Sequence, residues 1–333
     1  MNTFVIAEAG SNHNKSLEQA YALVDVAKES GAQAVKFQIF SSKTLYAENT
    51  PNFAGYGDIN ALMKTLELPR EWVPKIKEYC DKKNIEFMAT PFDEEAIQQL
   101  CDVGVKRMKI AGFESTDLRF VEMVAATKLP LIISAGIGCH IDFIQEIIDT
   151  CHKQSNYDIT ILHCNNAYPT PQEDINLLMV KDILEKYGKQ GVKVGLSDHT
   201  MSTITPALAV MVGATTIEKH FTISNKLPGP DHPFAMEPND LKKMNEEISL
   251  AELSLKRKKS EYTDSEKDFK MARRSVISKE EIKKGQELTQ ENITTSRPFL
   301  EGAVPASSYR EIIGSKTLRD IAPGTVIRRE DLG

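Results

Sequence analysis

Charged side chains interrupt segments of this sequence that are otherwise apolar and typical of buried strands. Lys36 and Lys109 lie inside two such segments. Glu8 lies in a third, and Glu114 follows soon after the segment that contains Lys109. Strands that are buried on both faces are usually a nearly continuous series of Val, Ile and Leu. Fold stability alone does not explain these residues, so their positions favour catalysis or ligand binding.

The two lysines suit the binding of an anionic substrate. Their ammonium groups would act as point charges toward phosphate or carboxylate. Ser134 ends another apolar segment and Asn166 follows a further one, so they would add a hydroxyl group and an amide as donors. The alternative is that Lys36 or Lys109 forms a Schiff base with a carbonyl substrate, as lysines of aldolase barrels do.

Two glutamates and two histidines are the candidates for proton transfer and metal binding. Glu8 and Glu114 could act as general acid and base, or only as counter-ions of the lysines. His199 and His220 end two consecutive segments, so their imidazoles could bind one divalent cation together with water or substrate oxygens. The alternative is that one or both histidines are hydrogen-bonded structural residues.

The elements that position these residues form a regular series. Apolar, β-rich segments alternate eight times with amphipathic helical segments, at 4–9, 34–39, 86–90, 107–111, 130–135, 160–164, 193–196 and 215–219. This alternation predicts an α/β fold, a (β/α)8 TIM barrel. A doubly wound open sheet is the competing arrangement, but no GxGxxG motif follows the first strand. The candidate residues would then share the barrel mouth at the strand carboxyl ends, with residues 40–68 as a long loop there.

The chain changes character after residue 255. A charged stretch at 256–274 begins with Lys-Arg-Lys-Lys and is predicted to be a solvated linker. Residues 281–293 then align without gaps to residues 320–332, which predicts a small β-rich domain built from two similar halves. We therefore expect a barrel domain at 1–255, a linker at 256–274 and a small domain at 275–333.

Composition excludes several classes of protein. The 333 residues contain 41 Lys and Arg against 47 Asp and Glu, and this net charge of −6 argues against binding to nucleic acid. Five cysteines without a CxxC motif predict reduced thiols and a cytoplasmic protein. The N-terminal residues lack the regions of a signal peptide, and no segment reaches the roughly 18 apolar residues of a membrane span.

A series of short motifs lies at the predicted strand ends and continues into the small domain. They are EAGSNHN (8–14), VKFQ (35–38), ATPF (89–92), KIA (109–111), ISAG (133–136), YPTP (168–171), LSDHT (196–200), IEKHFT (217–222), PGPDH (228–232) and RP (297–298). Together they resemble the N-acetylneuraminate (sialic acid) synthase family, which includes legionaminic and pseudaminic acid synthases and spore-coat polysaccharide synthases. The resemblance runs end to end and includes a C-terminal SAF (antifreeze-like) domain.

The resemblance implies condensation of phosphoenolpyruvate with an open-chain N-acyl hexosamine and water. With N-acetylmannosamine, the products would be N-acetylneuraminate, a nine-carbon 2-keto-3-deoxy acid, and phosphate. It also implies a divalent cation, Mn²⁺ or Mg²⁺, held by His199 and His220 as a Lewis acid for the sugar aldehyde. Glu8 and Asp231 would contact the sugar and metal-bound water, with Glu8 as the expected proton-transfer group. The residues implied to bind phosphoenolpyruvate are Lys36, Thr90, Lys109, Ser134, Asn166 and Tyr168.

The resemblance further implies a domain-swapped homodimer, in which the small domain of one subunit covers the barrel of the other. Arg297 matches the sugar-contacting arginine of that small domain. Phe113 stands where the N-acetylneuraminate members usually have glycine, which leaves a 2,4-diacetamido-trideoxyhexose (legionaminic or pseudaminic acid synthase) or a surface-polysaccharide sugar as alternative acceptors. A Schiff-base pyruvate aldolase and a non-catalytic sugar-binding barrel are the alternatives from other classes.

Overall fold

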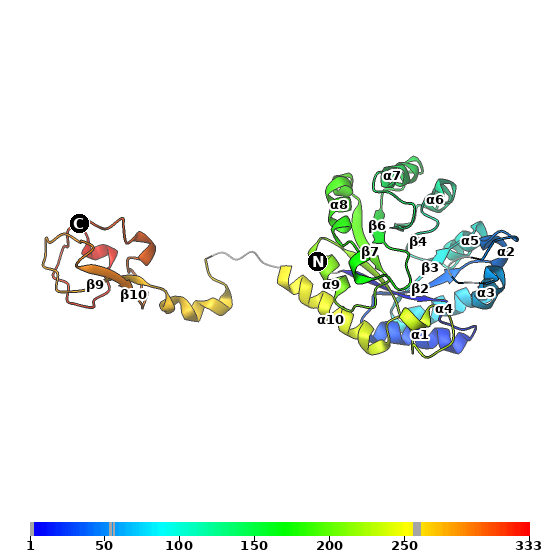
Figure 1. The fold of residues 1–333 in the computed structure, drawn as a ribbon, viewed down its shortest axis with the longest axis horizontal. Helices are drawn as coiled ribbons and strands as arrows, with labels where there is room; N and C mark the ends of the chain where they lie inside the picture. The colour runs from blue at the N-terminus through cyan, green and yellow to red at the C-terminus, as the bar shows by residue number, and fades with distance from the viewer. Residues whose placement is uncertain (1–2, 53–54, 56, 256–260) are drawn as a thin grey trace. The chain divides into compact units, whose positions relative to one another are not determined.

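A computed structural model describes residues 3–52, 55, 57–255 and 261–333 of the chain (Figure 1). The chain divides into two compact units, Met1–Lys256 and Arg257–Gly333, which are described separately. Of the predicted linker at 256–274, residues 256–260 lie outside the described residues. The remainder of that stretch contains an exposed 3-10 helix, Asp264–Ala272.

Eight parallel strands form the sheet of the first unit, in the hydrogen-bonded order β3-β2-β1-β8-β7-β6-β5-β4. The first and last strands along the chain, β1 and β8, pair with each other. Strands β3 and β4, at the two ends of this hydrogen-bonded order, lie side by side, so the sheet closes on itself. This arrangement confirms the predicted (β/α)8 barrel. The strands are β1 (Phe4–Gly10), β2 (Ala34–Ile39), β3 (Glu86–Pro91), β4 (Met108–Ile110), β5 (Leu131–Ala135), β6 (Ile159–Cys164), β7 (Lys193–Asp198) and β8 (Thr216–His220).

Helices surround these strands on the outside of the sheet (Figure 1). Each buries an apolar stripe in the core of this unit, and Asp93 and Asp117 cap two of them by accepting hydrogen bonds from backbone N–H groups. No helix among the described residues has the length and apolar character needed to cross a membrane. The helices are α1 (Leu17–Glu29), α4 (Val73–Lys83), α5 (Glu94–Asp102), α6 (Leu118–Ala125), α7 (Phe143–Lys153), α8 (Leu178–Tyr187), α9 (Thr205–Met211) and α10 (Pro238–Leu255).

The stretch at 40–68, predicted to be a long loop, contains two short helices, α2 (Ser42–Leu45) and α3 (Ile59–Leu66). Asp58 caps α3 by accepting a 3.0 Å hydrogen bond from the backbone N–H of Ala61. Short helices of this kind depend on such caps, because their own hydrogen bonds are few. Residues 53–54 and 56 of this stretch lie outside the described residues. The shorter 3-10 helices of the unit are Arg70–Trp72, Gln172–Asp174, Gly188–Gln190 and His232–Phe234.

The second unit is small and β-rich, with an antiparallel pair, β9 (Ser275–Ser278) and β10 (Ile293–Ser296), and two short 3-10 helices, Ala306–Ser308 and Arg329–Asp331. Its core consists of Val276, Ile282, Leu288, Ile293, Val304, Ile312, Ile321 and Ile327.

The two copies of the repeat pair with each other in this second unit. Ile282 and Ile321, which are equivalent in the repeat, exchange backbone hydrogen bonds of 2.9 and 2.8 Å. Ser278 Oγ donates to Ala322 O at 2.6 Å, and its equivalent Thr317 Oγ1 donates to Lys283 O at 2.8 Å. The repeat in the sequence is therefore a pseudo-twofold relation between two interlocked halves.

Candidate active site

The inside of the barrel changes from apolar to charged toward the carboxyl ends of the strands. Side chains two positions apart on a strand share a face, so they occupy successive layers of the interior. One layer is apolar and consists of Ile6, Ala34, Met88, Ile132 and Leu162. The next layer consists of the residues two positions further on, which are also buried: Glu8, Lys36, Thr90, Ser134 and Cys164. The change falls at the end of the barrel that carries catalytic groups in this fold.

Lys36, on β2, lies between two carboxylates of this layer. Its Nζ is 2.8 Å from Glu8 Oε2 and 3.7 Å from Glu218 Oε2, and it donates a 2.8 Å hydrogen bond to Thr90 Oγ1. Burial lowers the pKa of Lys36, but Glu218 and Glu8 outweigh it, and the net shift is upward. The ammonium group therefore stays charged although it is buried.

Lys109, on β4, lies on the other side of the Glu218 carboxylate from Lys36. Its Nζ lies 3.6 Å from Glu218 Oε1 and donates hydrogen bonds to Ser134 Oγ at 2.8 Å and Ile110 O at 2.9 Å. Burial lowers the pKa of Lys109, and Glu218 opposes that shift. The structure thus brings both predicted lysines together, each beside a predicted hydroxyl group.

Glu218, on β8, belongs to the IEKHFT motif, but the sequence analysis assigned it no role. Its Oε1 accepts a 3.1 Å hydrogen bond from Ser197 Oγ, whereas its Oε2 is buried and has no hydrogen-bond partner in the described parts of the chain. Burial raises the pKa of Glu218, but Lys109 and Lys36 outweigh burial and hold it below its usual value. Alternation along the strand was the available signal, because Glu218 shares a face with His220, two residues on.

Lys219, between these two residues of β8, points to the other face of the sheet. Its Nζ forms a buried ion pair with Asp198 Oδ2 at 2.7 Å. Asp198 also accepts a hydrogen bond from the backbone N–H of Thr200 at 2.9 Å. This pair joins β7 and β8 on the helix side of the barrel, so we assign it a structural role.

Glu8 lies between Lys36 and His220. It pairs in register with Lys36 of β2 on one side and with His220 of β8 on the other. Its Oε1 accepts a 2.8 Å hydrogen bond from Gln38 Nε2. Burial raises the pKa of Glu8, and Lys36 only partly offsets the shift.

His199 directly follows β7 and His220 ends β8, and their ring centroids are 5.3 Å apart. His199 Nδ1 lies 2.6 Å from Asn165 O, which leaves its Nε2 available. His220 Nδ1 is buried and has no hydrogen-bond partner among the residues that the structure describes. Burial lowers the pKa of His199 to about 4 and that of His220 well below its usual value, so both rings are neutral at pH 7. Neutral imidazole is the form that binds metals.

Asp231 lies beside the histidine pair, and Gly10 gives it room. A Cβ at Gly10 would stand 2.6 Å from Asp231 Oδ2 and 3.6 Å from His220 Nδ1. Burial raises the pKa of Asp231, whose Oδ2 accepts a 3.4 Å hydrogen bond from the Ser11 backbone. In the parts of the chain that the structure describes, no three His, Cys, Asp or Glu side chains form a complete metal-binding group. The two imidazoles would therefore need water or substrate oxygens to complete a coordination shell.

Glu114 lies in the turn between β4 and α6. Burial raises its pKa to about 7, and the charge of Lys109 opposes the shift. Its Oε2 is buried, and no described residue forms a hydrogen bond with it. A carboxyl group with a pKa of this value can both donate and accept a proton near neutral pH.

Asn166 and Tyr168 reach the mouth from the loop after β6. The Tyr168 ring centroid is 4.2 Å from that of His199 and 6.0 Å from that of His220. Burial raises the pKa of Tyr168, so the phenol stays protonated. Asn166 Nδ2 donates to Tyr168 Oη at 3.4 Å, and Asn166 Oδ1 accepts a 2.7 Å hydrogen bond from the Ile137 backbone.

Arg297 belongs to the second unit. It directly follows β10, is exposed, and forms a cis peptide bond with Pro298. Its predicted contact with a sugar remains a prediction.

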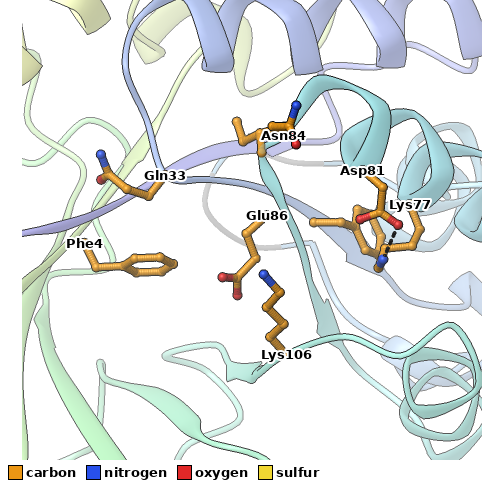
Figure 2. A pocket seen from close by; sticks show the side chains of 9 residues that line it. Phe4, Gln33, Lys77, Asp81, Asn84, Glu86 and Lys106 are labelled. Carbon is orange, nitrogen blue, oxygen red and sulfur yellow. Dashed lines mark hydrogen bonds and ion pairs between the residues drawn. The ribbon is translucent and has the colours of Figure 1, made fainter.

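A separate cavity of about 370 Å³ lies at the opposite end of the barrel (Figure 2). Phe4 and Glu86 begin strands β1 and β3, and Gln33 and Lys106 lie just before β2 and β4. Figure 2 shows these side chains with the Lys77–Asp81 ion pair at the rim. Residues at the amino ends of barrel strands usually serve stability rather than catalysis. We therefore place the candidate active site at the charged layer and not in this cavity.

Comparisons with known proteins show similarity over the whole length of the chain. The NeuB family matches residues 23–260, and the SAF domain matches residues 273–333. The N,N'-diacetyllegionaminic acid synthase of Legionella pneumophila is 38% identical, over 100% of this chain and 95% of its own. The pseudaminic acid synthase of Helicobacter pylori is 36% identical, over 98% of this chain and 97% of its own. The crystal structure of the spore coat polysaccharide biosynthesis protein SpsE from Bacillus subtilis superposes with a TM-score of 0.68 at 32% identity, covering 100% of this chain and 95% of that one.

Proposed function

This chain belongs to the NeuB family, and from this premise we propose that it condenses phosphoenolpyruvate with an N-acyl amino hexose to give a nine-carbon 2-keto-3-deoxy acid and phosphate. One observation carries the proposal: Lys36 and Lys109 are buried on either side of Glu218 at the carboxyl ends of the barrel strands. Buried cations of this kind are costly to maintain and suit an anion that enters the site.

In the proposed complex, phosphoenolpyruvate is held by the two ammonium groups and the donors beside them. Thr90 and Ser134 accept hydrogen bonds from Lys36 and Lys109, so each hydroxyl group can direct its own proton toward a phosphate or carboxylate oxygen. Asn166 Nδ2 and the protonated phenol of Tyr168 supply further donors on the β6 side.

We also propose a divalent cation, Mn²⁺ or Mg²⁺, held by His199 and His220. The residues fit such an ion, because the rings are neutral and His220 Nδ1 is buried without a partner. When bound, the cation would polarise the sugar aldehyde as a Lewis acid.

In the proposed reaction, phosphoenolpyruvate and the open-chain sugar react directly with each other. C3 of phosphoenolpyruvate attacks the aldehyde carbon, and the aldehyde oxygen takes up a proton. Water adds at C2 and gives up a proton. The C2–O bond to phosphate then breaks, the C2 hydroxyl group becomes the keto group, and its proton leaves with the phosphate. The pKa of Glu114 near 7 supports this residue as the group that exchanges these protons. Glu8, tied to Lys36 and Gln38, suits a contact with the sugar better than the proton transfer expected from the sequence.

For the acceptor sugar, the relatives support a diacetamido hexose over N-acetylmannosamine. The 38% identical relative is a N,N'-diacetyllegionaminic acid synthase, and the 36% identical one is a pseudaminic acid synthase. The domain-swapped homodimer is part of the same proposal, with Arg297 contacting the sugar. In this arrangement, Arg297→Ala would raise the KM for the sugar and leave that for phosphoenolpyruvate unchanged.

Phosphate release from phosphoenolpyruvate tests the function directly. The purified chain is incubated with N-acetylmannosamine and with 2,4-diacetamido-trideoxyhexoses in parallel, and the nine-carbon product is identified by mass spectrometry. Absence of release with every sugar would refute the proposal. Borohydride and pyruvate test the Schiff-base alternative, because trapping would add the mass of a reduced pyruvyl group to the protein.

A further inference from the structure

Two glycines follow the strands that carry Lys109 and Ser134. Gly112 lies two residues after β4, and Gly136 directly follows β5. Neither has a positive φ angle, so backbone conformation does not require glycine at either position. The reason for glycine here is space.

The side chain of Asn166 occupies the space that the two glycines leave. A Cβ at Gly136 would stand 2.2 Å from Asn166 Oδ1 and 2.7 Å from Gly112 Cα. A Cβ at Gly112 would stand 3.0 Å from both Oδ1 and Nδ2 of Asn166. The carboxamide therefore lies directly against two backbone segments, which restricts its rotation.

One hydrogen bond then fixes which end of this amide faces the mouth. The Ile137 backbone N–H donates to Asn166 Oδ1 at 2.7 Å, which assigns that atom as oxygen. Among the described residues, Nδ2 has one hydrogen-bond partner, Tyr168 Oη at 3.4 Å. An amide held in this way presents a donor, which suits an anion and not a cation.

We propose that Gly112 and Gly136 are positioning residues, which hold Asn166 as a fixed N–H donor for the phosphoenolpyruvate site. The inference rests on the proposed function, because that function supplies the anion. Preorganised donors bind an anion without the entropic cost of ordering a mobile side chain. A methyl group at Gly112 would shift the carboxamide away from the Ile137 N–H and misplace Nδ2.

The test is a double-mutant cycle on phosphoenolpyruvate affinity. Gly112→Ala, Asn166→Ala and the double variant are compared with the wild type by isothermal titration calorimetry with phosphoenolpyruvate alone. Gly112→Ala is the informative glycine variant, since its methyl group would stand 3.0 Å from the amide and 3.2 Å from Gly136 Cα, whereas a methyl group at Gly136 would stand only 2.7 Å from backbone. Gly188→Ala, in the 3-10 helix that precedes β7, is the matched control, because a Cβ there would also stand 3.0 Å from a side-chain atom, Leu184 Cδ1.

We expect Gly112→Ala to raise the Kd about five- to tenfold, the loss of roughly one hydrogen bond, with thermal unfolding unchanged. In the Asn166→Ala background, the same change should have no further effect. An unchanged Kd in Gly112→Ala, or an effect that adds to that of Asn166→Ala, would overturn the inference. A wild-type protein that does not bind phosphoenolpyruvate would instead refute the proposed function and the inference with it.

Discussion

Lys36 and Glu8 face each other in register on β2 and β1, and Lys36 Nζ lies 2.8 Å from Glu8 Oε2. Their side chains are 3% and 1% exposed. A buried ion pair is a weak source of stability, yet the loss of one partner leaves an uncompensated charge. Because Lys36 also faces Glu218, it neutralises charge from two carboxylates at once.

Lys36→Met should therefore destabilise the barrel by about 3–5 kcal/mol and abolish phosphate release. Adding Glu8→Gln should restore part of the stability, since it removes a buried charge, but no activity. Urea unfolding followed by circular dichroism measures the first effect. Lys193→Met is the control: the exposed pair of Lys193 and Asp158 should contribute no more than about 1 kcal/mol. Equal stability of Lys36→Met and the wild type would contradict the prediction.

Glu114 should give the reaction a pH dependence near 7. Its pKa rises from 4.5 to about 7 in the folded chain, so the folded state holds the proton more tightly. The stability that this residue contributes is present below pH 4.5 and is lost as the pH rises through about 7. Glu114→Gln should remove this slope from urea-unfolding measurements between pH 4.5 and 8.

The same variant should lose about 10²–10⁴-fold in kcat and lack the limb near pH 7 in its rate profile. Glu71→Gln, at an exposed position on the outside of the barrel, is the control. A rate profile of Glu114→Gln that keeps the limb would assign proton transfer to another group, and Glu8→Gln would then be the next variant to measure.

Metal removal should stop the reaction. EDTA treatment of the wild type, and His199→Ala or His220→Ala, should each lower the rate about hundredfold or more, because the Lewis acid stabilises the transition state by several kcal/mol. Mn²⁺ binding by calorimetry should be lost in both variants, while their circular dichroism spectra stay unchanged. His140→Ala, at a histidine whose side chain is 75% exposed, should behave as the wild type. Full activity of the EDTA-treated enzyme would refute a metal role.

The barrel was predictable because its strands are short, apolar and evenly spaced. The predicted segment at 34–39 coincides with β2, and the other strands differ by a few residues at their ends. The location of the candidate site followed from the same pattern, since the carboxyl ends of parallel strands meet at one mouth. Lys36, Lys109 and Ser134 were found in this way, because polar residues stand out in buried strands.

Other features depend on contacts between distant segments and were not predictable from spacing. Alternation places Glu218 on the same face of β8 as His220, but its position between two lysines depends on how β8 closes the barrel beside β1. The close approach of Gly112 and Gly136 is likewise a contact between two loops. Helix α3 was missed because its cap, Asp58, is a weak signal in a stretch rich in Gly, Pro and Asn.

The pseudo-twofold relation in the second unit gives a prediction about stability. Ile282 and Ile321 are fully buried, and their backbones exchange hydrogen bonds between the two halves of the unit. Ile282→Ala and Ile321→Ala should therefore destabilise this unit by similar amounts, about 2–5 kcal/mol each. Hydrogen exchange of peptides from residues 275–333 measures the effect without interference from the barrel. Leu318→Ala, at a residue that is 53% exposed, should change stability by less than about 0.5 kcal/mol.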